Sequence, residues 1–164
     1  MISLLLLDLI GKTLLILKLN RVDMKKKIII LSGGFDPVHK GHVRMFKAAK
    51  EYGSVVVGAN SDDWLIRKKN KFFMPFDERK EILESIRFID EVVDFNDDDD
   101  TACDLIKVIY SEFGDKYDVC FGNGGDRTNE TTPEVEFCIK NNIEMLWGLG
   151  GGKIQSSSDL LKNW

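Results

Sequence analysis

Five short apolar runs recur along the chain from residue 27 onward, and stretches with helical periodicity separate them. Each run is short and continuous, as is typical of strands buried on both faces of a parallel sheet. The runs span residues 27–32, 54–60, 90–95, 117–122 and 143–149. The other stretches predict helices at 42–52, 77–89, 102–113, 133–142 and 156–164. This alternation predicts a Rossmann-like α/β fold, an open parallel five-stranded sheet with right-handed crossovers and helices on both faces.

Capping and charge signals refine the helix boundaries. The four aspartates at 97–100 are predicted to form a solvated loop that ends in an N-cap for the helix at 102–113, where negative charge favours the helix dipole. In the helix at 77–89, apolar residues fall on one stripe at helical spacing. Serines at 156–158 predict a cap for the last helix, and the residues between 60 and 77 are predicted as a lysine-rich loop.

Both histidines of the chain lie where the first apolar run ends. The segment "GGFDPVHKGH", residues 33–42, holds His39 and His42 together with Gly33, Gly34 and Gly41. Glycines let the backbone turn and let an anionic group come close, and the start of the next helix offers free N–H groups. Ligands of open parallel sheets bind at the carboxyl ends of the strands. The segment therefore predicts a phosphate site with two imidazole donors.

The composition is that of an ordinary globular domain, and a length of 164 residues fits a single domain. A net charge of −4 argues against a surface that coats nucleic acid, although it is compatible with a local basic pocket. The three cysteines are widely spaced and form no metal-binding or disulfide pattern. They indicate a reduced, cytoplasmic protein.

Residues 1–23 are rich in leucine but are interrupted by Asp8, Lys12 and Lys18. They fall short of the roughly 20 clean apolar residues of a membrane span, and they lack the features of a secretory signal. We expect a leader of uncertain role, either a segment packed on the domain or a stretch before the natural start, with a membrane anchor least favoured. The domain itself is predicted over residues 24–164, because "MKKKIIILSGG" is a natural opening for a strand-first domain.

The segment at 33–42 resembles the G-x-F-D-x-x-H-x-G-H signature of the cytidylyltransferase-like nucleotidyltransferases. The agreement includes Phe35 and Asp36 as well as the glycines and histidines, and the resemblance continues through 59–62, 77–93 and 156–158. It covers the chain from about residue 27 to the end and implies an enzyme. A substrate phosphate would attack the α-phosphorus of a nucleoside triphosphate, pyrophosphate would leave, and the histidines would stabilise the developing charge.

The resemblance also implies further phosphate-binding residues. Lys68, Arg79 and Arg87 would bind the phosphates of nucleotide and substrate. The spacing of the two arginines predicts that they lie on roughly the same side of one helix. Asp36 is expected mainly to organise the turn. Mg²⁺ is the expected cofactor, held chiefly by phosphate oxygens and not by a protein cage. The other residues expected to bind the nucleotide are Gly33, Gly34, Phe35, Gly41, Gly125, Asp126, Ser156, Ser157 and Ser158.

Two details bear on the substrates. The "GGD" at 124–126 is similar to that of heptose-1-phosphate adenylyltransferases, and Gly151 stands where glycerol-3-phosphate cytidylyltransferases carry an arginine. These details favour ATP and a sugar phosphate over CTP and glycerol or ethanolamine phosphate. The insert at 127–133 departs from both groups.

The sequence leaves two further functions open. One is that of a pantetheine-phosphate or nicotinamide-mononucleotide adenylyltransferase, and the second is that of a non-catalytic nucleotide-binding module. The expected partners are a nucleoside triphosphate and a small phosphorylated substrate, with neither nucleic acid nor membrane. The resemblance implies a homodimer.

Overall fold

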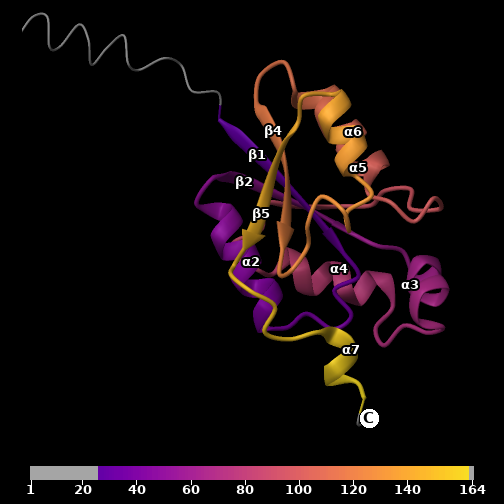
Figure 1. Ribbon diagram of the computed structural model, residues 1–164. Coiled ribbons are helices and arrows are strands. Elements are labelled where there is room, and N and C mark those ends of the chain that lie inside the picture. Colours follow the sequence, from indigo (N-terminus) through magenta and orange to yellow (C-terminus); the bar gives the residue numbers. More distant parts are fainter. Residues whose placement is uncertain (1–25, 163–164) are drawn as a thin grey trace, which may run out of the picture.

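A parallel five-stranded sheet lies at the centre of the computed structural model, which describes residues 26–162 (Figure 1). The strand order is β3-β2-β1-β4-β5, and every neighbouring pair is parallel, which confirms the predicted fold class. The predicted leader lies outside the described residues. The strands are β1 (Lys27–Gly33), β2 (Gly53–Ala59), β3 (Glu91–Val93), β4 (Asp118–Gly124) and β5 (Glu144–Leu149).

Helices cover both faces of the sheet and enclose one apolar core on each. Ile29 and Leu31 of β1 pack into the core beneath α2 (Lys40–Lys50) and α4 (Phe76–Glu84). Ile28 and Ile30 pack into the core beneath α5 (Cys103–Phe113) and α6 (Val135–Lys140). Because successive side chains of a strand point to opposite faces, β1 is buried on both sides, which explains its unbroken apolar run.

β1 and β4 separate at their carboxyl ends, where the strand order switches from one side of β1 to the other. β1 pairs with β2 as far as Gly33 opposite Ala59, but its pairing with β4 ends at Ile30 opposite Phe121. The pairing of β4 with β5 is also irregular between Gly122 and Gly124. The carboxyl ends of β1 and β4 are therefore free to line a cavity, as expected at the switch point of such a sheet.

The helices differ from those predicted at several places, three of which bear on the site. The loop expected between 60 and 77 contains a helix, α3 (Asp62–Lys69), whose N-cap hydroxyl of Ser61 accepts the N–H of Trp64 at 3.0 Å. The helix expected at 77–89 ends at Glu84, after which Ile86 and Ile89 turn inward to pack on the core. Arg87 therefore lies beyond the helix that carries Arg79.

The third difference is at the start of α5. The acidic run does not cap this helix: the N-cap residue is Ala102, which has no capping side chain, and its N–H is bonded instead by the Glu134 carboxylate at 2.8 Å. The last helix, α7 (Ser157–Leu160), is shorter than predicted but carries the predicted serine cap, because Ser156 accepts the N–H of Asp159. No helix within residues 26–162 is both long and apolar enough to cross a bilayer.

Candidate functional site

A cavity of about 300 Å³ opens at the carboxyl ends of β1 and β4. Its wall comprises the histidine turn, parts of α3, the end of β4, the loop after β5 and the start of α7. Nine of its 24 lining residues are glycines. Much of the wall is therefore bare backbone, which lets a flat or anionic ligand approach main-chain N–H groups closely.

The two histidines cap the start of α2 reciprocally. Nδ1 of His39 accepts the N–H of Gly41 at 3.1 Å, and Nδ1 of His42 accepts the N–H of His39 at 3.3 Å. The rings stack with their centroids 3.7 Å apart. Since each Nδ1 accepts a hydrogen bond, the proton of each neutral ring lies on Nε2. The pair thus offers two Nε2–H donors from residues that line the cavity.

Close packing orients this pair and explains the neighbouring glycines. The ring of Phe35, a residue at a φ of 49°, is buried and meets the ring of His42 edge-on, with centroids 5.0 Å apart. A Cβ at Gly33 would lie 3.1 Å from the Phe35 ring, and one at Gly34 would lie 2.8 Å from Leu65. Side chains at these positions would push the turn away from the sheet.

The surroundings of both imidazoles favour their neutral form. Burial lowers the pKa of His39, and burial, with repulsion from the protonated form of His39 and from Lys69, lowers the pKa of His42 to about 3. A neutral ring donates one hydrogen bond from Nε2, whereas an anionic ligand in the cavity would favour the protonated form. The site is therefore organised to respond electrostatically to a phosphate group.

The charged side chains on the cavity wall are all cationic. Lys69, Arg127 and Lys153 line it, and no aspartate or glutamate does so among the described residues. A local basic pocket thus exists within an acidic chain. Nowhere in residues 26–162 do three or more His, Cys, Asp or Glu side chains gather in an arrangement that could hold a metal ion.

Ten of the predicted site residues line this cavity, and five do not. The ten are His39, His42, Gly33, Gly34, Phe35, Gly41, Gly125, Ser156, Ser157 and Ser158. Of these, Ser157 also ties α7 to the histidine turn, because its hydroxyl donates to the carbonyl of Pro37 at 2.8 Å.

The five residues outside the wall have other surroundings. Lys68 forms an exposed ion pair with Asp100 at 3.2 Å, and Arg87 stacks its guanidinium on Phe88. Asp126 is exposed beyond the end of β4. Asp36 and Arg79 are buried beside the turn and bond to protein groups.

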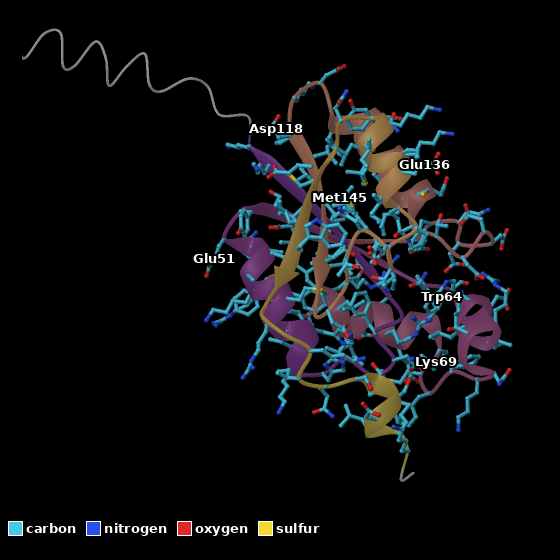
Figure 2. The ribbon with its side chains drawn as sticks, viewed as in Figure 1. Glu51, Trp64, Lys69, Asp118, Glu136 and Met145 are labelled. Atoms are coloured by element: carbon cyan, nitrogen blue, oxygen red, sulfur yellow. The ribbon has the colours of Figure 1, made fainter. Side chains whose placement is uncertain are left out.

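Sequence reasoning missed Trp64, Lys69, Asn123, Arg127 and Lys153 in this wall. Figure 2 shows Trp64 and Lys69 on the α3 side, well away from Asp118 and Glu136. Trp64 Nε1 and Asn123 Nδ2 are buried donors without a hydrogen-bond partner. Buried donors are rarely left unpaired, so both favour a ligand rich in acceptors. A cap-and-charge analysis of residues 61–69 would have found α3, but nothing local marks Asn123.

Known proteins resemble this chain in sequence and in fold. Residues 30–147 match the family model described as cytidylyltransferase-like. The chain is 39% identical over 71 residues to the glycerol-3-phosphate cytidylyltransferase of Bacillus subtilis, covering 43% of this chain and 54% of that protein. It is 38% identical over 115 residues to the bifunctional protein HldE of Sulfurimonas denitrificans, covering 68% of this chain and 22% of that protein.

A third relative is the FAD synthase of Thermococcus kodakarensis, with 40% identity over 73 residues that cover 43% of this chain and 49% of that protein. The chain thus spans about half the length of these curated relatives, or less. Among solved structures, the lipopolysaccharide core biosynthesis protein of Thermoplasma volcanium shares the fold. It aligns with a TM-score of 0.57 and 20% identity over 74% of this chain and 95% of that one.

Proposed function

Because the chain belongs to the cytidylyltransferase-like family, we propose that it is a nucleotidyltransferase acting on a small phosphorylated substrate. It transfers a nucleoside monophosphate group from a nucleoside triphosphate to the substrate's phosphate and releases pyrophosphate. The observation that carries this proposal is the reciprocally capped histidine pair at the cavity wall, with two Nε2–H donors beside a helix start.

In the proposed reaction, an oxygen of the substrate phosphate attacks the α-phosphorus, and the bond from that phosphorus to the bridging oxygen of pyrophosphate breaks. The phosphate monoester is already ionised near neutral pH, so the reaction has little need of a general base. Catalysis then depends on in-line positioning and on donors aimed at the developing negative charge. His39 and His42 are the proposed donors, and Lys69, Arg127 and Lys153 are suited to hold phosphate groups.

The donor set fits Mg²⁺ only as an ion that arrives on the phosphates. The described wall offers hydroxyl, carboxamide and backbone oxygens together with cationic side chains, and it offers no carboxylate. When bound, Mg²⁺ would neutralise phosphate charge. Among the wall residues, the serines at 156–158 carry hydroxyl oxygens that are suited to contact such an ion.

We favour ATP as the nucleotide and a sugar phosphate as the acceptor. Gly125 and Gly151 line the cavity at φ values of 67° and 87°, and a Cβ at Gly151 would meet nothing within 4 Å. The space beside this backbone supports the proposal that the cavity accommodates a purine base. The similarity to a glycerol-3-phosphate cytidylyltransferase supports the second candidate, CTP with an alcohol phosphate.

Pyrophosphate release is the test. We would cross ATP and CTP with heptose, glycerol and ethanolamine phosphates, using a variant that carries both His39→Ala and His42→Ala as the control. Release with ATP and a sugar phosphate is the expected result, and release with CTP and an alcohol phosphate would select the second candidate. Nucleotide binding without release from any pair would make the protein a binding module and overturn the proposal.

A further inference from the structure

Arg79 is completely buried, at 0% exposure, and does not line the cavity. A guanidinium has five N–H donors, and hydrogen bonds to the protein occupy four of those of Arg79. Nε donates to the Met74 carbonyl at 3.0 Å, Nη1 to the carbonyls of Gly34 at 2.7 Å and Asn60 at 2.8 Å, and Nη2 to Asp62 Oδ1 at 2.7 Å. This bonding leaves Arg79 poorly placed to hold a ligand phosphate.

Asp36 holds the same loop from the other side. Its carboxylate is 1% exposed and accepts the N–H of Phe73 at 2.7 Å and the N–H of Met74 at 2.8 Å. The Met74 residue is therefore fixed at both of its backbone groups, the N–H by Asp36 and the carbonyl by Arg79. Asp36 and Arg79 both bond to this stretch of backbone, and such charge-assisted hydrogen bonds are stronger than bonds between neutral groups.

The partners of Arg79 belong to two segments that each contribute residues to the cavity wall. Gly34 is a wall residue of the histidine turn, and Asn60 and Asp62 lie at the end of β2 and the start of α3. Lys69, at the far end of α3 from Asp62, lines the wall. One guanidinium thus joins the segment that carries the histidines to the segment that carries Lys69.

We propose that Arg79 and Asp36 are positioning residues, which clamp the loop 70–75 and set the placement of the histidine pair relative to Lys69. Their effect on turnover rests on the proposed function, whereas their effect on the geometry of the free protein does not. The clamp gives Arg79 a positioning role in place of the direct phosphate binding that the sequence resemblance implied.

Arg79→Lys and Asp36→Asn test the clamp from its two sides. Lysine keeps the positive charge but lacks the planar fork, and asparagine loses one of the two carboxylate acceptors. The first readout is the ¹⁵N chemical shifts of the His39 and His42 rings in the ligand-free full chain. Both variants are expected to move these signals, whereas the matched surface variant Lys80→Met, which breaks only an exposed pair with Asp94, leaves them in place.

The second readout is the dissociation constant for pyrophosphate, measured by calorimetry. Each variant is expected to weaken binding about tenfold, and the double variant to weaken it by less than the product of the two, because both act on the same residue, Met74. Unmoved histidine signals in both variants, with weaker pyrophosphate binding only in Arg79→Lys, would identify Arg79 as a direct ligand and overturn the proposal. Should Arg79→Lys fail to fold, Asp36→Asn and the milder Asp62→Asn give the same ring-shift readout.

The outcomes separate this proposal from the enzymatic one. Shifted histidine signals in a protein that releases no pyrophosphate with any substrate pair would uphold the clamp and reject the nucleotidyltransferase activity. Unshifted histidine signals in an active enzyme would reject the clamp and uphold the nucleotidyltransferase activity. In an active enzyme, the clamp variants are expected to lower kcat more than they raise KM for the nucleotide.

Discussion

Each histidine of the pair uses Nδ1 to hold the start of α2 and keeps Nε2–H for a ligand. An alanine substitution would therefore remove a helix cap and the proposed catalytic donor together. Asparagine separates the two roles at position 39, because it is among the best N-cap residues but lacks an imidazole. The choice of substituent decides which role an experiment reports.

We expect His39→Asn and His42→Ala to lower turnover by about two to three orders of magnitude, the scale of losing a preorganised donor. His39→Asn should keep the free energy of unfolding close to that of the wild type, whereas His39→Ala should lose about 1 kcal/mol with its cap. Pyrophosphate release and urea unfolding measure the two effects. Normal turnover in His39→Asn would show that the ring serves the helix and not the reaction.

The low pKa of His42 also makes stability depend on pH. The folded ring titrates at about 3, below the ordinary value of 6.5, so the unfolded chain binds a proton first as pH falls. The free energy of unfolding should therefore drop between pH 6.5 and 3, by up to about 1.4 kcal/mol per pH unit from this group. His42→Gln should show a shallower profile in urea unfolding across that window, and parallel profiles would contradict the burial of a neutral ring.

At the scale of elements, α3 shows what apolar periodicity overlooks. Leu65 is its one fully buried side chain, so the helix carries no apolar stripe. Ser61 caps its start, aspartates occupy its first turn and basic residues its last, which suits the helix dipole. The opposite error occurred in α4, where Ile86 and Ile89 continued the helical spacing although the chain had already turned toward β3.

Neighbouring lysines at the end of α3 allow a matched test. Lys69 lines the cavity, whereas Lys68 forms an exposed ion pair with Asp100. Lys69→Ala should weaken pyrophosphate binding about tenfold or more, the cost of a lost charge-assisted contact. Lys68→Ala should change it little, because exposed pairs contribute little. A larger effect of Lys68→Ala than of Lys69→Ala in calorimetry would support phosphate binding by Lys68, as the sequence resemblance implied.

For the molecule as a whole, the described residues that line the cavity run from Ser32 to Ser158. A chain that begins at Met24 keeps all of them and the whole of β1. We expect it to release pyrophosphate at the rate of the full chain, and sizing in solution will test the expected homodimer. A soluble, folded and inactive shortened chain would mean that residues 1–23 contribute to the site.

The fold was predictable because strands buried on both faces leave unbroken apolar runs that need no knowledge of their partners. The centre of the site was predictable for a similar reason, since both histidines and their glycines lie within ten consecutive residues. The place of Asn123 in the wall and the bonding partners of Arg79 were not predictable, because the fold assembles the surroundings of both residues from distant segments. Lys68 and Lys69 are neighbours in α3, but successive residues of a helix point in different directions, and only Lys69 lines the cavity.

Ser157 donates its hydroxyl hydrogen bond to Pro37, a residue 120 positions earlier in the chain. The ribosome synthesises Pro37 well before Ser157, and chains begin to fold from the amino terminus as they emerge. The histidine turn is thus synthesised long before its last wall, and for that interval the growing chain has no closed place for a nucleotide. Nucleotide binding would therefore report a chain in which Ser157 has already docked on the histidine turn.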